Sequence, residues 1–332
     1  MRLLVLGGTG FLSGAIATHA LRDGDDVTCL ARGTTGVPPA GATFVRAGRD
    51  DPAAYDDVAN TDWDAVVEIS SDPQRVRAAA AALAPRTQHF AYISSASVYV
   101  EDATPNQDES AAFHEPTEDG AASDPELYGA HKVACEHIAR AEFGDDKTTI
   151  VRAGLIGGPG DRSDRTGYWP LRFARPADER GRVLIPDAPD LATQVIDVRD
   201  LATFVLHCAR AGIAATFNAL GDSIALAKHF ATAQRVAGFR GTTVAADPAW
   251  LTAHDVAPWM GPRSLPLWLP LPEYAGFGTR NGSAARRAGL QIRGLEETLA
   301  DVLVWERTRD IAARRAGLTD DDERQLLQQL EG

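Results

Sequence analysis

The sequence predicts an α/β protein built around a doubly wound parallel sheet. Two observations support this fold class. In the first half of the chain, short runs of entirely apolar residues alternate with stretches of helical periodicity, as in βαβ units. The first apolar run, residues 3–6, leads directly into the glycine-rich segment 7–10. Uninterrupted apolar runs are typical of strands that helices cover on both faces of a sheet.

The expected elements follow in chain order. We expect strands at residues 2–6, 27–31, 43–47, 65–69, 89–94, 148–152 and 215–220. We expect helices at residues 11–22, 52–59, 73–84, 125–142, 198–210 and 224–237, and a short helix in the C-terminal segment TDDDERQLLQQLEG. Glycine and proline content predicts a loop over 157–170 and irregular structure over 255–282. These patterns predict a first domain over 1–160, to which 195–220 returns, and a smaller interleaved domain over 161–332.

Composition excludes several classes of function. The 332 residues carry a net charge of -13, which is unsuited to binding nucleic acid or an anionic membrane. The three cysteines, Cys29, Cys135 and Cys208, form no paired motif, so we expect neither a metal site nor a disulfide framework. No apolar run approaches the ~18 residues that a membrane span needs, and the first strand leaves no room for a signal peptide. We therefore expect a cytoplasmic protein.

The glycine-rich turn predicts an anion site. The segment GGTGFLSG (7–14) places Gly7, Gly10 and Gly14 after the first strand, with Ser13 where a third motif glycine would stand. A helix that begins directly after a strand presents free backbone N–H groups and the positive end of its dipole, which suit the pyrophosphate of a dinucleotide. The alternative is a tight turn without a ligand.

The end of the second strand bears on the choice of dinucleotide. A carboxylate at this position would bind the ribose 2′-hydroxyl of NAD, whereas an arginine suits the 2′-phosphate of NADP. The segment VTCLARG (27–33) contains no acid, and Arg32 stands next to the expected position. We therefore expect NADP(H) to be preferred, with NAD(H) as the alternative. A solvated loop arginine is the other interpretation of Arg32.

Two further motifs suggest proton-transfer chemistry. The segment YGAHK places Tyr128 and Lys132 four residues apart, on one face of a helix. A lysine ammonium beside a phenol favours the phenolate, so the tyrosine can act as an acid or a base. Upstream, FAYISSASVY (90–99) leads from an apolar strand into Ser94, Ser95 and Ser97, at the edge where such sheets bind ligands. Ordinary turn chemistry would also explain these serines.

Taken together and in this order, the motifs resemble the NAD(P)-dependent epimerase/dehydratase family of extended short-chain dehydrogenases/reductases. The segments GGTGF (7–11), ISSASVY (93–99), YGAHK (128–132) and VRAGLIGGPGD (151–161) carry the resemblance, which covers roughly residues 1–300. It implies a Rossmann-type sheet with a smaller, mostly C-terminal substrate-binding domain. It also implies that Ser95, four residues before Tyr99, is the catalytic serine, that Tyr128 is the general acid/base and that Lys132 lowers its pKa and binds the nicotinamide ribose. The implied cofactor-binding set is Gly7, Thr9, Gly10, Phe11, Leu12, Arg32, Arg49, Lys132 and Leu155.

Departures from the family pattern narrow the reaction. Sugar-nucleotide 4,6-dehydratases carry an Asp–Glu pair where this chain has Ala96 and Ser97, so we do not expect a dehydratase. Ala96 also occupies the position of the cysteine in some 3,5-epimerase/reductases. Leu155 stands where sugar-nucleotide members have an asparagine for the substrate diphosphate, which disfavours such substrates. Gly48 replaces an aspartate that contacts adenine, and we expect Arg49 to stack on adenine or to reach the 2′-phosphate.

We interpret the chain as an NADP-preferring oxidoreductase that transfers hydride between nicotinamide C4 and a secondary alcohol or ketone of a small metabolite. Ser95 and Ala96, with Tyr168 and Trp169, are the expected substrate-binding residues, and Trp259 lies in a second aromatic segment. Domain packing explains any single one of these aromatic residues better than substrate contact does. The alternatives are an NAD-dependent sugar or sugar-nucleotide epimerase and a non-catalytic cofactor- or RNA-binding relative. We expect a homodimer without a metal.

Overall fold

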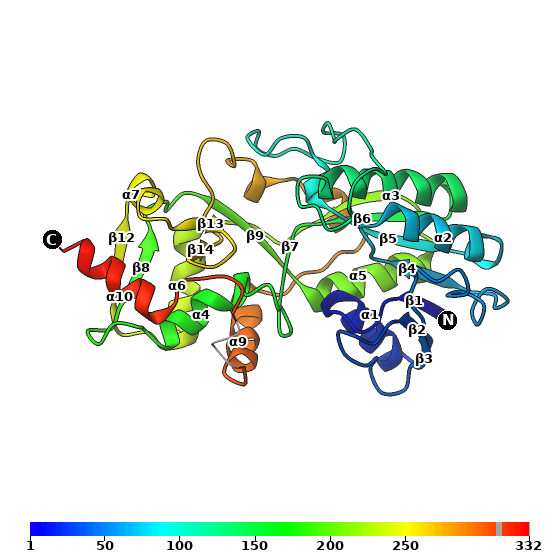
Figure 1. The fold of residues 1–332 in the computed structure, drawn as a ribbon, viewed down its shortest axis with the longest axis horizontal. Helices are drawn as coiled ribbons and strands as arrows, with labels where there is room; N and C mark the ends of the chain where they lie inside the picture. The colour runs from blue at the N-terminus through cyan, green and yellow to red at the C-terminus, as the bar shows by residue number, and fades with distance from the viewer. Residues whose placement is uncertain (310–313, 332) are drawn as a thin grey trace.

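The computed structural model describes residues 1–309 and 314–331. Its main element is a parallel seven-stranded sheet in the order β10-β6-β5-β4-β1-β2-β3 (Figure 1). The strands are β1 (Arg2–Leu6), β2 (Asp26–Ala31), β3 (Thr43–Arg46), β4 (Ala65–Glu68), β5 (Phe90–Ser95), β6 (Thr148–Ala153) and β10 (Thr216–Ala219). The sheet confirms the expected fold class. The strand order reverses between β1 and β4, and such a reversal opens a crevice at the carboxyl ends of the strands.

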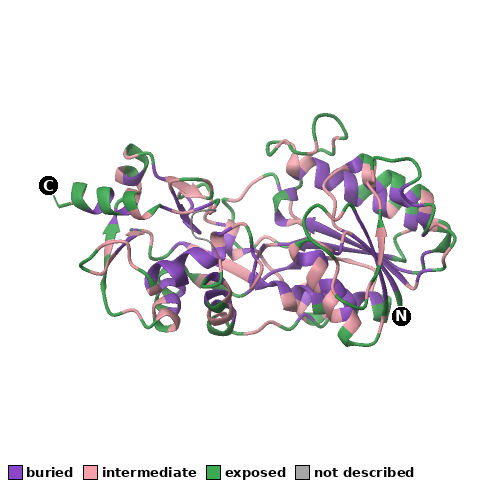
Figure 2. Cartoon of the chain, turned by 60° about the horizontal axis from the view of Figure 1, so that its bottom comes forward, coloured by how far each residue is buried: buried purple, intermediate pink, exposed green. Residues whose placement is uncertain are grey.

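Helices cover both faces of this sheet, as the apolar strands require. Helices α1 (Phe11–Arg22) and α5 (Val198–Ala211) pack on one face, and α2 (Pro73–Leu83) and α3 (Tyr128–Phe143) pack on the other. Figure 2 shows the strands buried between the two helical layers. We call the seven strands and these four helices the sheet domain. Its two cores hold the carboxyl ends of the strands, and therefore the site, in place.

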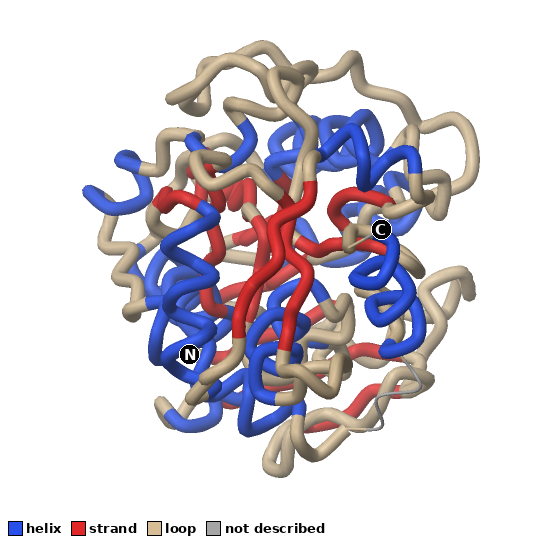
Figure 3. The backbone as a smooth tube through the Cα atoms, turned by 90° about the vertical axis from the view of Figure 1, so that its left-hand side faces the viewer, coloured by secondary structure: helices blue, strands red, loops and turns tan. Residues whose placement is uncertain are grey.

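The remaining elements form a second domain with a core of its own. They are β7 (Leu155–Gly157), α4 (Arg165–Ala174), β8 (Arg182–Pro186), β9 (Ala192–Asp197), β11 (Ser223–Ala225), α6 (Leu226–Ala237), β12 (Thr242–Ala246), α7 (Pro248–Ala253), β13 (Ala257–Trp259), β14 (Ser264–Pro266), α9 (Leu295–Glu306) and α10 (Asp320–Gln329). A short helix, α8 (Ser283–Arg287), contributes Ala285 to the sheet-domain core. Figure 3 shows strands at the centre of the molecule, with helices and loops around them.

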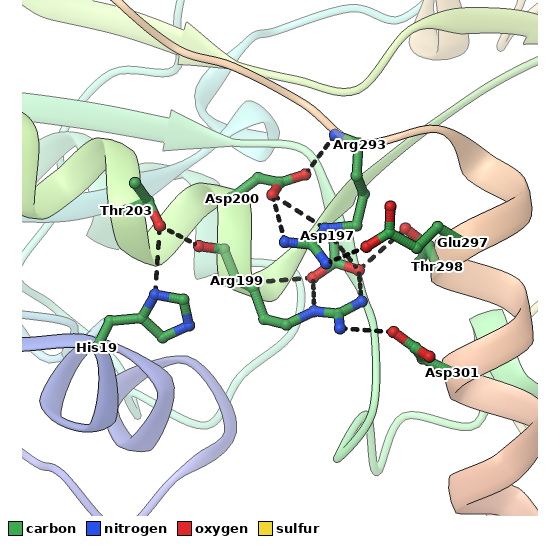
Figure 4. A network of polar contacts seen from close by, with 9 residues as sticks. All are labelled: His19, Asp197, Arg199, Asp200, Thr203, Arg293, Glu297, Thr298 and Asp301. Carbon is green, nitrogen blue, oxygen red and sulfur yellow. Dashed lines mark hydrogen bonds and ion pairs between the residues drawn. The ribbon is translucent and has the colours of Figure 1, made fainter. Parts of the chain in front are cut away.

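An ionic network around the buried Asp197 joins the two domains (Figure 4). The Asp197 carboxylate, at the N-cap of α5, accepts hydrogen bonds from Arg199 at 2.7 and 2.9 Å and from the Thr298 hydroxyl at 2.9 Å. Arg293 pairs with Asp200 at 2.8 Å. Burial alone would raise the pKa of Asp197, but Arg199 and Thr298 hold it below its usual value. The carboxylate therefore stays charged and ties α5 to α9.

Three expected elements differ in the structure. Residues 52–59 form turns rather than a helix, because several backbone bonds there span three residues, as from Val58 N–H to Tyr55 O. The aspartates of this segment favour local turns over helix. The expected loop over 157–170 turns into α4 at Arg165, whose aromatic residues pack in the second core despite Pro170. Residues Ser223–Ala225 are a strand, so α6 begins two residues later than expected.

The other expected strands and helices are present, with ends shifted by up to three residues. Among the described residues, no helix has both the length and the apolar character required to cross a membrane.

Candidate active site

The glycine turn between β1 and α1 has the backbone that only glycine adopts easily. Gly7 and Gly8 have φ of +135° and +91°, and a Cβ on Gly8 would lie 2.3 Å from Cys29 Sγ. Gly10 donates its N–H to the Ser13 hydroxyl at 3.1 Å, so the serine at the third motif position supports the turn. The turn brings bare backbone to the N-terminus of α1, where an anion is stabilised.

A cleft opens beside this turn. It has a volume of about 280 Å³. Its walls come from the carboxyl ends of β1, β2 and β4, and include Gly7, Thr9, Gly10, Arg32, Thr35, Arg49 and Glu68. An open, glycine-lined approach with cations on its wall fits the pyrophosphate and adenosine parts of a dinucleotide. The residues present therefore fit the expected cofactor.

The two expected arginines occupy different environments. Arg32 is exposed on the cleft wall, and it has no ion pair within the part of the chain that the structure describes. Arg49 instead pairs with the fully buried Glu68 at 2.5 Å. Burial would lower the pKa of Arg49, but the Glu68 carboxylate raises it above its usual value. The free cation facing this cleft is therefore Arg32, and Arg49 has a structural partner that the expected adenine or phosphate contact did not include.

Glu68 was not identified from the sequence. Its Oε1 accepts the backbone N–H groups of Ile69 and Ser70, both at 2.8 Å, while Oε2 binds Arg49. Both oxygens are occupied, so Glu68 offers no free carboxylate to a ribose hydroxyl. The sequence signal for Glu68 was an acidic residue at the end of the otherwise apolar strand AVVE (65–68).

Ser95 and Tyr128 lie at facing ends of two elements. Ser95 ends β5 and accepts the Ser97 N–H at 3.1 Å, which turns the chain through a short 3₁₀ segment, Ala96–Val98. Tyr128 begins α3. Gly129 allows the two to approach, because a Cβ there would lie 2.2 Å from the Ser97 carbonyl oxygen. Among the described residues, no hydrogen bond joins Ser95, Tyr128 and Lys132 directly, and both the serine and the tyrosine are half-buried.

Lys132 lies one helical turn below Tyr128. Its ammonium donates to the carbonyl oxygens of Ile69 at 3.0 Å, Ser70 at 3.2 Å and Ile93 at 2.7 Å. These three acceptors account for its three protons and join α3 to the carboxyl ends of β4 and β5. In this conformation Lys132 positions the helix, and contact with a ribose requires exchange of one of these hydrogen bonds.

Glu136 lies one further turn along the same helix face and was not predicted from the sequence. It pairs with Arg152 of β6 at 2.8 Å and accepts the Ser94 hydroxyl hydrogen at 2.5 Å. Both charged side chains are about 95% buried, with exposed fractions of 6% and 5%. Residues 128, 132 and 136 thus form one polar stripe that faces the sheet edge. The sequence signal for Glu136 was the four-residue spacing of YGAHK, extended by one more step.

The remaining expected residues do not line the cleft. Tyr168 and Trp169 are 1% and 0% exposed in the second core, where the Trp169 indole donates to the Pro266 carbonyl at 2.7 Å. Leu155 belongs to the same core. Leu12 points into the sheet-domain core, so only its backbone can face a ligand, whereas Phe11 lies at the turn beside Gly160. Ala96 is 7% exposed, directly after Ser95.

The family model for NAD dependent epimerase/dehydratases matches residues 3–219, a range that includes the glycine turn, Ser95, Tyr128 and Lys132. The chain belongs to the NAD dependent epimerase/dehydratase family. It is therefore an NAD(P)-dependent enzyme, as its motifs predicted. No curated protein matches the sequence.

Solved structures agree with this fold. A proposed epimerase from Burkholderia cenocepacia J2315 matches with a TM-score of 0.70 and 23% identity, over 93% of this chain and 98% of that chain. RMD from Pseudomonas aeruginosa, complexed with NADPH, matches with a TM-score of 0.65 and 17% identity, over 93% and 99%. The Bordetella bronchiseptica enzyme WbmH, in complex with NAD⁺, matches with a TM-score of 0.63 and 16% identity, over 92% and 98%.

Proposed function

We propose that this member of the epimerase/dehydratase family is an NADP-preferring oxidoreductase that reduces a ketone of a small metabolite. The observation that carries the proposal is the juxtaposition of Ser95 and Tyr128 across the Gly129–Ser97 contact, at the carboxyl edge of the sheet. This edge also carries the glycine turn and its cleft. A hydride donor in that cleft and a proton donor beside it are the two parts that ketone reduction needs.

The side chains divide the work at the substrate oxygen. Ser95 donates a hydrogen bond to the carbonyl oxygen and holds it beside Tyr128. The Tyr128 phenol then donates its proton to that oxygen as the alcohol forms. Lys132 keeps α3 against β4 and β5 and places a positive charge beneath the tyrosine, where it stabilises a phenolate. The nicotinamide cofactor, when bound, supplies the hydride.

Arg32 supports the preference for NADP. It is the exposed cation at the end of β2, whereas Glu68, the buried acid of the same cleft, is already bound to Arg49 and two backbone N–H groups. A free guanidinium and no free carboxylate suit a 2′-phosphate better than a 2′-hydroxyl.

Replacement of Tyr128 tests the catalytic assignment. We expect Tyr128→Phe to lower kcat by roughly 10²–10⁴-fold, because it removes the proton donor. The dissociation constant for NADPH should stay within about twofold, since the hydroxyl is not on the cleft wall. Turnover is followed at ~340 nm, the band of the reduced nicotinamide. Tyr274→Phe is the matched control, because it removes a half-buried hydroxyl that lies in the second domain. Near-normal turnover by Tyr128→Phe would refute the assignment.

An epimerase that oxidises and re-reduces one carbon is the second candidate, favoured by the family match itself. Such an enzyme must keep its hydride between the two half-reactions. The nucleotide released on denaturing the purified protein separates the two candidates: stoichiometric NAD supports the epimerase, and an empty protein that binds NADPH better than NADH supports the reductase.

A further inference from the structure

Arg165, the first residue of α4, has an oriented guanidinium with an open edge. Its Nε donates to the Ser163 hydroxyl at 3.1 Å, and the group lies over the Trp259 ring with its central carbon 5.0 Å from the ring centroid. These two contacts hold the guanidinium in place. The two terminal nitrogens donate to no acceptor among the residues that the structure describes. A guanidinium that is held in place and keeps its terminal edge free can bind an oxyanion in a bidentate manner.

The chain is acidic, with 46 Asp and Glu against 33 Lys and Arg, so most of its cations can find a carboxylate. Over residues 1–309 and 314–331, every other arginine without a carboxylate partner is exposed, whereas Arg165 is half-buried. The adjacent carboxylate of Asp161 accepts hydrogen bonds from the backbone N–H of Ser163 and from Thr166 instead. On the same helix, Arg172 pairs with Asp320 at 2.7 Å. The fold therefore neutralises one arginine of α4 and leaves the other unpaired.

The position of Arg165 links it to the active site. The loop that leads from β7 to α4 passes the glycine turn, where a Cβ on Gly160 would lie 3.2 Å from the Phe11 ring. Burial lowers the pKa of Arg165, and the neighbouring Asp161 carboxylate acts in the opposite direction. The loop therefore brings the start of α4 to the side of the sheet where the glycine turn lies.

We propose that Arg165 binds an oxyanion of the substrate, a carboxylate or a phosphate, through both terminal nitrogens of its guanidinium. The inference rests on the proposed function, because it places this oxyanion on the same molecule as the ketone that Tyr128 protonates. It narrows the substrate to keto acids and phosphorylated ketones. The pyrophosphate of the cofactor has the same chemistry, so the experiment must separate the two sources.

The first experiment compares ketones that differ only in charge. Phenylpyruvate is paired with its methyl ester, and dihydroxyacetone phosphate with dihydroxyacetone, and NADPH consumption gives kcat/KM for each. We expect the wild type to favour the charged member of a pair by about 10–100-fold. Arg165→Gln should lose this preference by slowing only the charged member, and Arg165→Lys should retain part of it. Arg162→Gln, an exposed neighbour in the same loop, should change nothing. Equal slowing of both members by Arg165→Gln would overturn the proposal.

Two binding measurements do not depend on turnover. The dissociation constant for NADPH, from quenching of tryptophan fluorescence, should change less than twofold in Arg165→Gln; a tenfold rise would assign the arginine to the cofactor and overturn the proposal. Inorganic phosphate, titrated calorimetrically into the NADPH-saturated enzyme, should bind in the millimolar range to the wild type and Arg162→Gln but not to Arg165→Gln. Absence of phosphate binding to the wild type would also overturn it. Phosphate binding without turnover of any ketone would refute the reductase and leave the oxyanion site standing.

Discussion

The two domains treat buried polar groups differently. In the sheet domain, Glu136, Arg152 and Ser94 are buried together and satisfy one another with hydrogen bonds of 2.5–3.0 Å. In the second domain, His229 is fully buried and both ring nitrogens lack a partner among the described residues. The Thr193 hydroxyl is likewise buried and unpartnered. Both residues border one cavity of about 260 Å³.

The difference matches the roles that we propose for the two domains. The proposed proton donor Tyr128 must be held within a fraction of an ångström of its reacting atom, and a saturated polar network under α3 supplies that rigidity. In the second domain, by contrast, unpartnered polar groups border a cavity. On the sheet side, His131 leaves Nδ1 unpartnered, but its Nε2 is hydrogen-bonded to the Asp119 carbonyl.

Breaking the saturated network should give the largest effect. We expect Glu136→Ala to lower the free energy of unfolding by about 3–5 kcal/mol, because it leaves the Arg152 charge buried without its partner. Urea denaturation measures the change. The double replacement Glu136→Leu with Arg152→Met should recover much of the loss, since it removes both charges. A loss below about 1 kcal/mol in the single variant would show that the buried ion pair does not stabilise the sheet domain.

The unpartnered His229 of the second domain predicts a pH dependence of stability. Burial lowers the pKa of His229 from 6.5 to about 4. Below pH 6.5, His229 is protonated in the unfolded chain but stays neutral in the folded protein. Its contribution to the free energy of unfolding is therefore fully present above pH 6.5 and is lost as the pH falls toward about 4. The loss should be about 1.4 kcal/mol per pH unit, or about 3 kcal/mol over the whole window.

Urea denaturation at pH 7 and pH 5 tests this prediction. The wild type should lose about 2 kcal/mol more than His229→Gln between these two values. His207→Gln, at an exposed position on α5, is the control and should behave as the wild type. Identical pH dependence in the wild type and His229→Gln would mean that the buried imidazole has partners, and the contrast between the two domains would weaken.

The smallest expected effect concerns the open cation of the cofactor cleft. Arg32→Ala should raise the dissociation constant for NADPH by about 10–100-fold and that for NADH by less than about threefold, because only the former carries a 2′-phosphate. Fluorescence titration with both nucleotides measures the two constants. Arg46→Ala is the control, since Arg46 is exposed at the end of β3 and lies over the Phe44 ring. Equal weakening of both nucleotides would remove the basis for the NADP preference.

Local sequence patterns predicted the sheet domain well, because its strands are apolar on both faces and alternate along the chain with its helices. They predicted Lys132 one turn from Tyr128 for the same reason, since helical spacing is a local property. The helix expected over 52–59 is wrong, because the aspartates of this segment favour local turns and the chain folds there as successive turns. Tyr168 and Trp169 pack in the second core, and Tyr168 also lines a cavity of about 310 Å³, so their contact with a substrate stays a prediction.

The sequence by itself determined the sheet, the glycine turn and the order of the catalytic motifs, because each depends on neighbours within one strand, turn or helix. Only the tertiary structure decided which charges are neutralised. Arg49 pairs with Glu68, 19 residues along the chain, because the ends of β3 and β4 meet at one cleft. Arg152 on β6 pairs with Glu136 on α3. Arg165 has no carboxylate partner in the described part of the chain, because the Asp161 carboxylate beside it accepts hydrogen bonds from Ser163 and Thr166 instead. Ion pairing depends on distances in space, which a local sequence pattern does not contain.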